Sequence, residues 1–169
     1  MNIVLCGMMG SGKTSLGKRI AERLGYAWAD SDLVIEERYG SIPTLFQTSG
    51  EEYFRRIERE VIAELSRKEK LVLSTGGGVL LDESNQTLLK KAGKILFLRA
   101  TKETLLCRLQ GDKKRPLLQG GELEGKIERL LTERTPVYER VADGVLDVDG
   151  YTKEENANRA IEVIKTWQV

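Results

Sequence analysis

A glycine-rich segment near the start of the chain, Gly7-Met-Met-Gly-Ser-Gly-Lys-Thr14, has the residue types needed to bind a polyphosphate. It follows the apolar run Ile3–Cys6 and matches the P-loop pattern G-x-x-x-x-G-K-[ST]. Glycines let backbone N–H groups crowd around phosphate oxygens, and the next helix adds partial positive charge at its N-terminus. Lys13 can neutralise terminal phosphates, and the Thr14 hydroxyl can bind Mg²⁺. A chance glycine turn is the alternative, but an apolar run before and a helical pattern after the segment favour nucleotide binding.

Two carboxylates follow the second apolar run, in Asp30-Ser31-Asp32. One could hold Mg²⁺ through water, and the other could orient an attacking hydroxyl or accept its proton. The alternative is that a carboxylate only caps the helix that starts near Leu33. The segment follows a predicted strand in a P-loop protein, and this position favours the functional interpretation.

Three consecutive glycines, Gly76–Gly78, follow the apolar run that starts at Leu71. Such a run costs backbone entropy, so the chain needs either unusual dihedral angles or the close approach of a ligand there. A flexible turn is the alternative. We expect these glycines to form the floor of the site for the phosphate acceptor.

Two arginines lie where they could bind an anionic substrate group. Arg55 is next to the apolar Phe54, and Glu58 is one helical turn further on, where its carboxylate can hold the guanidinium. An arginine held in this way can bind a carboxylate through two hydrogen bonds. Arg134 precedes Pro136, which disturbs a helical pattern. Either this is a kinked surface helix, or the bend presents Arg134 to the pocket.

A basic segment, Lys113-Lys114-Arg115-Pro116-Leu117-Leu118, is followed by Gly120-Gly121 and interrupts the helical pattern. A charged run in a loop is usually just solvated. A basic segment framed by glycine is also typical of a mobile lid that closes over ATP and brings a cation to the transferred phosphate. We expect such a lid around residues 110–122, with Arg115 as its cation.

The composition excludes several classes of protein. The chain has 169 residues, of which 40% are hydrophobic and 31% charged, as expected for one folded domain spanning residues 1–169. A net charge of +1 argues against a general binder of nucleic acid or membrane surfaces. The absence of histidine excludes histidine acid–base chemistry and Ser-His-Asp triads. Cys6 and Cys107 lie far apart, which predicts buried free thiols in a reducing compartment rather than a disulfide or metal site.

The sequence favours a cytoplasmic protein. The first apolar run begins almost at the N-terminus, so we expect no signal or transit peptide. No apolar run approaches the ~18 residues of a membrane span. No long apolar stripe suggests a subunit interface, so we expect a monomer.

Short apolar runs alternate with amphipathic ones, which predicts an α/β sandwich around a parallel sheet. Ligands of such sheets lie outside the carboxyl ends of the strands. The P-loop, the two aspartates and the three glycines should therefore meet there. Capping boxes are expected at Ser49/Glu52 and Thr152/Glu155. The predicted strands are 3–6, 27–29, 71–74, 95–98 and 145–148, and the predicted helices are 15–24, 33–39, 51–68, 82–91, 102–109, 125–141 and 153–167.

Six motifs in this order make the chain resemble the shikimate kinase family over essentially its whole length. A P-loop alone is shared by many NTPases, whereas the arginines separate this family from nucleotide kinases. The resemblance implies a P-loop, nucleoside-monophosphate-kinase-like three-layer fold with a five-stranded parallel sheet. It also implies ATP-dependent phosphorylation of the 3-hydroxyl of shikimate, on the route to chorismate and aromatic amino acids. The motifs are Gly7–Thr14, Asp30-Ser-Asp32, Phe54-Arg-Arg-Ile-Glu58, Thr75-Gly-Gly-Gly78, Arg115-Pro-Leu-Leu and Arg134-Thr-Pro-Val-Tyr138.

The resemblance further implies a role for each matching residue. Asp32 would bind the shikimate hydroxyls where a base acts, Arg55 and Arg134 would hold the carboxylate, and Gly77 would give a backbone contact. Mg²⁺ would be the metal cofactor. The implied ATP contacts are Gly10, Ser11, Gly12, Lys13, Thr14, Ser15, Arg108 (near the adenine) and Arg115; the substrate contacts are Asp32, Arg55, Gly76, Gly77, Gly78 and Arg134; the catalytic residues are Lys13, Asp32 and Arg115; and the metal contacts are Thr14 and, through water, Asp30.

One loop departs from the family pattern. Family members often carry an arginine near the adenine after the last strand, but this loop reads Asp149-Gly150-Tyr151-Thr152, so the adenine contacts are not assigned. Two other functions stay open. The chain could be another small-metabolite kinase of this fold, such as a gluconate or nucleoside-monophosphate kinase. It could also be a non-catalytic ATP-binding homologue, which would require loss of a functional position, and none is missing.

Overall fold

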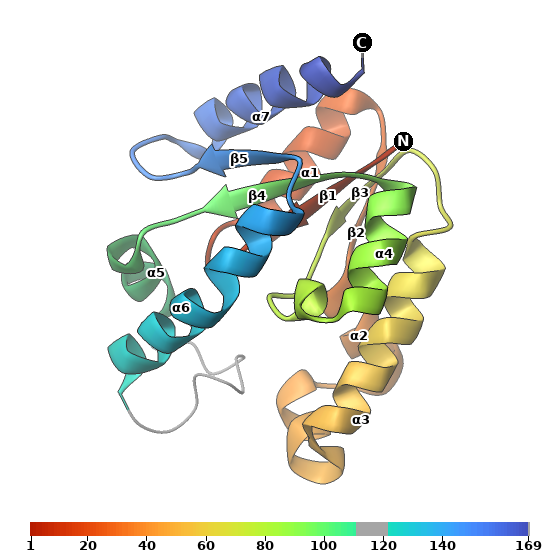
Figure 1. Cartoon of the computed structure of the whole chain (residues 1–169), viewed down its shortest axis with the longest axis vertical. Coiled ribbons are helices and arrows are strands. Elements are labelled where there is room, and N and C mark those ends of the chain that lie inside the picture. Colours follow the sequence, from red (N-terminus) through yellow and green to blue (C-terminus); the bar gives the residue numbers. More distant parts are fainter. Residues whose placement is uncertain (111–121, 169) are drawn as a thin grey trace.

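A five-stranded sheet forms the centre of the protein in the computed structural model, which describes residues 1–110 and 122–168 (Figure 1). Within these residues the strand order is β2-β3-β1-β4-β5, and every pair of neighbours is parallel. The predicted α/β class and all five predicted strand positions are confirmed. The strands are β1 (Asn2–Cys6), β2 (Ala27–Asp30), β3 (Leu71–Ser74), β4 (Gly93–Arg99) and β5 (Gly144–Asp147).

Helices cover both faces of this sheet, giving the expected three layers (Figure 1). Side chains of β1 alternate between two cores: Ile3 and Leu5 pack with α1 and α7, whereas Val4 and Cys6 pack with α3, α4 and α6. A strand buried on both faces must be apolar throughout, as this one is. The helices are α1 (Lys13–Leu24), α2 (Ser31–Tyr39), α3 (Ile42–Leu65), α4 (Glu83–Ala92), α5 (Lys102–Leu109), α6 (Leu123–Val141) and α7 (Lys153–Trp167), with a 3₁₀ turn η1 (Val79–Leu81).

The sequence missed the first part of α3. The element begins at Ile42, and the Ser41 hydroxyl caps it by accepting a hydrogen bond from the backbone N–H of Thr44. Gly50, with φ 82° and ψ 169°, breaks the helical geometry, so that two helical segments meet there. The helix predicted from about residue 51 corresponds to the second segment, which ends at Leu65. The capping box of α7, Thr152 with Glu155, is confirmed.

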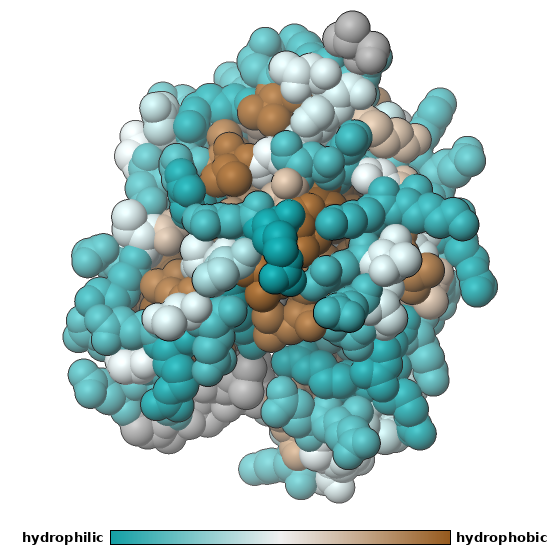
Figure 2. Space-filling model, viewed as in Figure 1, coloured by the Kyte–Doolittle hydropathy of each residue, from teal (hydrophilic) through white to brown (hydrophobic). Residues whose placement is uncertain are grey.

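The surface and the cysteines agree only in part with the sequence predictions. Most of the face seen in Figure 2 is hydrophilic, and apolar residues appear there as separate patches. Among residues 1–110 and 122–168, no helix combines the length and apolarity needed to cross a bilayer.

Both cysteines are free thiols. Cys6 is buried, and this burial raises the pKa of its thiol to about 12. Cys107 is exposed, so its predicted burial is wrong, because α5 turns this residue away from the core.

Gly17 lets α1 approach the sheet closely. A β-carbon at this position would lie 2.4 Å from Ser74 Oγ and 2.6 Å from Trp28 Nε1. These atoms are fixed, because Trp28 donates a hydrogen bond to Ser74 Oγ, which donates to the carbonyl of Lys13. We expect Gly17→Ala to lower the free energy of unfolding by about 1–3 kcal/mol through overpacking, measured by urea denaturation.

Gly125 provides the matched control for this prediction. It also lies in a helix, but among the described residues a β-carbon there would meet just one atom within 4 Å, Glu122 Oε2 at 3.9 Å. Gly125→Ala should raise the free energy of unfolding by roughly 0.5–1 kcal/mol, because alanine is the better helix former. Equal effects of the two substitutions would contradict the crowding at Gly17.

Candidate active site

A cavity of about 560 Å³ lies at the carboxyl ends of β1, β2 and β3. Parallel strands bring the loops that follow them to one edge of the sheet, and the cavity forms where these loops meet side chains of α3 and α6. Ser11 is buried in the P-loop beneath it. Arg115 and the expected lid lie in a segment outside the described residues. The predicted residues that line the cavity are Gly10, Gly12, Lys13, Thr14, Ser15, Asp30, Asp32, Arg55, Gly76, Gly77, Gly78, Arg108 and Arg134.

The P-loop joins β1 to the N-terminus of α1, with Gly12 at the N-cap position and φ 96°. The Lys13 ammonium is nearly buried and donates hydrogen bonds to the carbonyls of Gly7 (2.7 Å) and Met8 (2.9 Å). The buried Ser11 hydroxyl has no hydrogen-bond partner among the described residues. A buried hydroxyl and a lysine beside a helix N-terminus suit an anionic ligand.

Asp30 combines the two roles that the sequence left open. Its Oδ1 accepts hydrogen bonds from the backbone N–H groups of Asp32 (2.9 Å) and Leu33 (3.2 Å), so it does cap α2. Its Oδ2 accepts a hydrogen bond of 2.6 Å from the Thr14 hydroxyl. This pair of oxygen ligands fits Mg²⁺, which keeps several waters and takes its other ligands from phosphate. Within the described parts of the chain, no group of three or more acidic, histidine or cysteine residues is arranged so that it could hold a metal ion by itself.

Each of the three glycines, Gly76–Gly78, makes room for one predicted substrate residue. A β-carbon on the first would lie 2.6 Å from Asp32 Oδ1, and on the second 2.6 Å from Arg134 Nη1. On the third it would lie 2.5 Å from Arg55 Nη1. The glycine run therefore forms a floor against which a carboxylate from α2 and two guanidinium groups from α3 and α6 converge.

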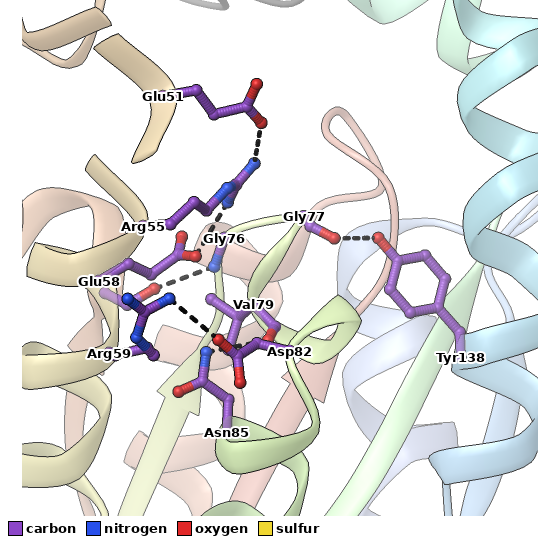
Figure 3. Close-up of polar contacts among 11 residues, drawn as sticks. Glu51, Arg55, Glu58, Arg59, Gly76, Gly77, Val79, Asp82, Asn85 and Tyr138 are labelled. Atoms are coloured by element: carbon purple, nitrogen blue, oxygen red, sulfur yellow. Dashed lines mark hydrogen bonds and ion pairs between the residues drawn. The ribbon is translucent and has the colours of Figure 1, made fainter. Parts of the chain in front are cut away.

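Two carboxylates hold the Arg55 guanidinium (Figure 3). Its Nη1 donates to Glu58 at 2.9 Å and its Nη2 to Glu51 at 3.4 Å. Burial raises the pKa of the Glu58 carboxyl, and the charge of Arg55 opposes this shift. Burial lowers the pKa of Arg55, but the neighbouring Glu58 and Glu51 outweigh it and raise the value overall. The guanidinium thus stays charged, and the sequence-based placement of Glu58 beside it is confirmed.

Arg134 differs from Arg55 because the residue is only 2% exposed and no ion pair with a carboxylate is found for it among the described residues. Its Nε and Nη1 have no hydrogen-bond partner among the described residues. Leaving buried charged donors unpaired is costly. The arrangement fits an anionic group that binds in the cavity and accepts hydrogen bonds from Arg134.

The family assignment follows from comparison with known proteins. The family model for shikimate kinase matches residues 9–165 of this chain. The chain belongs to the shikimate kinase family. Since most of the chain matches, the resemblance drawn from the six motifs is confirmed.

Individual relatives agree with this assignment. The shikimate kinase of Actinobacillus succinogenes is 44% identical over 168 residues, covering 98% of this chain and 96% of the relative. The shikimate kinase of Thermodesulfovibrio yellowstonii is 45% identical over 162 residues, covering 95% and 93%. The structure of shikimate kinase from Acinetobacter baumannii in complex with shikimate has a TM-score of 0.96 and 38% identity, covering 99% of this chain and 94% of that one. The nucleoside-monophosphate-kinase-like P-loop fold expected of the family is therefore confirmed.

The sequence did not identify every residue that lines the cavity near the P-loop. Arg108 lines it and donates a hydrogen bond of 2.9 Å to the carbonyl of Gly10. Lys153, the first residue of α7, also lines the cavity, although the loop before it has no basic residue. Lys153 comes directly after the loop 149–152, and this position was the sequence signal that could have identified it as a basic residue near the cavity. Tyr151 stacks against the guanidinium of Arg159, 3.8 Å from the ring centroid.

Apolar side chains in the wall of the cavity were also missed. Ile42 and Phe46, from the unpredicted first part of α3, line it together with Phe54, and the two phenylalanine rings are 4.9 Å apart. Leu33 and Glu36 of α2 complete this wall. The spacing of Ile42, Leu45 and Phe46 by three or four residues was the helical signal that could have found it.

Proposed function

We propose that this protein transfers the γ-phosphoryl group of ATP to the 3-hydroxyl of shikimate, giving shikimate 3-phosphate and ADP. The observation that carries this proposal is the convergence of Asp32, Arg55 and Arg134 on the glycine floor beside a P-loop. Two guanidinium groups suit the carboxylate of shikimate, and a carboxylate suits its hydroxyls. Relatives named shikimate kinase, and the Acinetobacter baumannii structure in complex with shikimate, support this choice. The product would feed the route to chorismate and aromatic amino acids.

The reaction needs positioning and charge neutralisation more than covalent catalysis. In our proposal, the P-loop from Gly10 to Ser15 binds the phosphates of ATP, and Lys13 neutralises charge that develops during transfer. Asp32 orients the 3-hydroxyl and accepts its proton. Arg55 and Arg134 hold the carboxylate, which fixes the acceptor relative to the γ-phosphoryl group. Arg115 would add a second cation from the lid, and Arg108 would lie near the adenine.

We further propose Mg²⁺ as the metal, held by Thr14 and, through water, by Asp30. When bound there, the metal would supply positive charge that neutralises the phosphates of ATP. Excess EDTA should reduce shikimate-dependent ADP release to background, and Mg²⁺ should restore it. Because no structural metal cluster is found within the described residues, the circular dichroism spectrum should not change. Turnover that continued in EDTA would contradict this assignment.

A panel of acceptors tests the proposed substrate against its alternatives. ADP release should require shikimate and should stay near background with gluconate or a nucleoside monophosphate. Gluconate and a nucleoside monophosphate also carry an anionic group, so the preference follows from the placement of Asp32 and the two guanidinium groups around one small acceptor rather than from charge alone. Release with another acceptor alone would favour a different small-metabolite kinase. ATP binding without release for any acceptor would favour a non-catalytic homologue.

The remaining expectations complete the proposal. We propose that residues 1–169 act as a single domain with a lid around residues 110–122. We propose a cytoplasmic monomer that does not bind nucleic acid or membranes. The small net charge of +1 supports the last two points.

A further inference from the structure

Tyr138 is a buried polar side chain that the proposed reaction does not use. It lies on α6 and is 1% exposed, with its ring 5.1 Å from that of Phe97 in β4. Its hydroxyl points at the glycine floor and donates a hydrogen bond to the carbonyl of Gly77 (Figure 3). A phenylalanine would fill the same space, so the hydroxyl has a role that packing alone does not require.

The same hydroxyl lies beside Arg134, one helical turn earlier on α6. A β-carbon added to Gly77 would be 2.6 Å from Arg134 Nη1 and 3.7 Å from the Tyr138 hydroxyl oxygen. Burial raises the pKa of Tyr138, and the charge of Arg134 only partly offsets this. The hydroxyl therefore stays protonated and can donate to the Gly77 carbonyl over the working pH range.

Ser31 fixes the opposite end of the floor. Its hydroxyl accepts a hydrogen bond of 2.9 Å from the backbone N–H of Gly76, and it is adjacent to Asp32 on α2. The floor is thus tied to the helix that carries Asp32 through Ser31, and to the helix that carries Arg134 through Tyr138. Each tie joins segments distant in sequence: 45 residues separate Ser31 from Gly76, and 61 separate Gly77 from Tyr138.

We propose that Tyr138 is a positioning residue for the acceptor site: its hydroxyl sets the spacing between α6 and the glycine floor, and so holds Arg134 where the acceptor carboxylate binds. This inference rests on the proposed shikimate phosphorylation. The Nε and Nη1 of Arg134 have no hydrogen-bond partner among the described residues, whereas the Tyr138 side chain interacts with its guanidinium. Its placement therefore depends on where α6 lies relative to the floor.

Tyr138→Phe tests the proposal, because it removes the hydroxyl and keeps the ring. We expect the KM for shikimate to rise about 5- to 20-fold, since a charged hydrogen bond to the substrate is weakened and the Gly77 carbonyl is left unpaired. The kcat should change by less than about threefold, and the KM for ATP by less than about twofold, because the P-loop is untouched. Both constants come from initial rates of ADP release.

Val141→Ala is the matched control. Val141 is 3% exposed and lies three residues further along the same helix, so its truncation loosens the packing of α6 without removing a hydrogen bond. It should lower the midpoint of thermal unfolding and leave the KM for shikimate near that of the wild type. A purely structural role of Tyr138 would give both variants the same kinetic behaviour.

Each outcome decides the inference. A selective rise in the KM for shikimate in Tyr138→Phe, absent from Val141→Ala, supports it. An unchanged KM, or equal rises for both substrates, overturns it. Wild-type protein without shikimate-dependent ADP release would refute the proposed function itself, which is a separate result.

A second variant keeps the test decisive if Tyr138→Phe does not fold. Gly77→Ala would press on the Arg134 guanidinium from the floor while leaving the packing of Tyr138 intact. It should produce the same selective rise in the KM for shikimate. A wild-type value in this variant would show that the spacing between floor and guanidinium does not matter, and would overturn the proposal.

Discussion

Replacing Lys13 by alanine is expected to lower kcat/KM by about 10²- to 10³-fold, the loss seen when one key electrostatic donor is removed. The Lys13 ammonium is enclosed by the P-loop and lies within hydrogen-bonding distance of two of its carbonyls. The substitution removes the positive charge nearest the expected phosphates together with these contacts. Because charge develops on the transferred group, the loss should appear mainly in kcat.

Lys18→Ala provides the control for this measurement. Lys18 is an exposed lysine on the same helix, and its ammonium lies 4.8 Å from the ring centroid of Trp28. Its removal changes the net charge by the same amount but leaves the P-loop intact, so initial rates of ADP release should stay near the wild-type value. Circular dichroism should show that both variants are folded. Turnover of Lys13→Ala within about threefold of the wild type would refute the role assigned to Lys13.

The parts of the site that follow strands could be predicted from the sequence. Short apolar runs identified all five strands, and parallel pairing forces the residues after them to one edge of the sheet. This is why the P-loop, Asp32 and Gly76–Gly78 were expected to meet, and why they do. Arg55 and Glu58 were also accessible, because their spacing of three residues on a helix is a local property.

The features that depend on tertiary contacts were not predictable in this way. The sequence indicated that three glycines needed a close approach, but not that each one faces a different side chain. The exposure of Cys107 and the position of Lys153 at the cavity depend on how α5 and α7 pack. The first part of α3 was missed because Ser49 and Glu52 match a capping box, which indicated a helix starting at residue 51. The pairing of Tyr138 with Gly77 has no local signal, because 61 positions separate the two residues along the chain.

Replacing Arg134 by alanine should raise the KM for shikimate by about 10- to 100-fold and change the KM for ATP by less than about threefold. The range corresponds to losing about 1.5–3 kcal/mol, as expected for hydrogen bonds to a charged group. Arg134 is 2% exposed, touches the floor at Gly77, and has two donor nitrogens without hydrogen-bond partners among the described residues. An anionic group that enters the cavity can accept hydrogen bonds from these donors. Arg134→Lys should recover part of the loss, because it keeps the charge but not the planar, two-pronged donor.

Arg140→Ala separates this local effect from the general loss of a positive charge. Arg140 lies on the same helix but is exposed, so both KM values should remain near those of the wild type. Initial rates at varied shikimate and saturating ATP, and the reverse, give the two constants for each variant. A parallel rise in both constants for Arg134→Ala would place Arg134 at the nucleotide instead. An unchanged KM for shikimate would mean that the carboxylate binds elsewhere, and the proposed acceptor site would then be wrong.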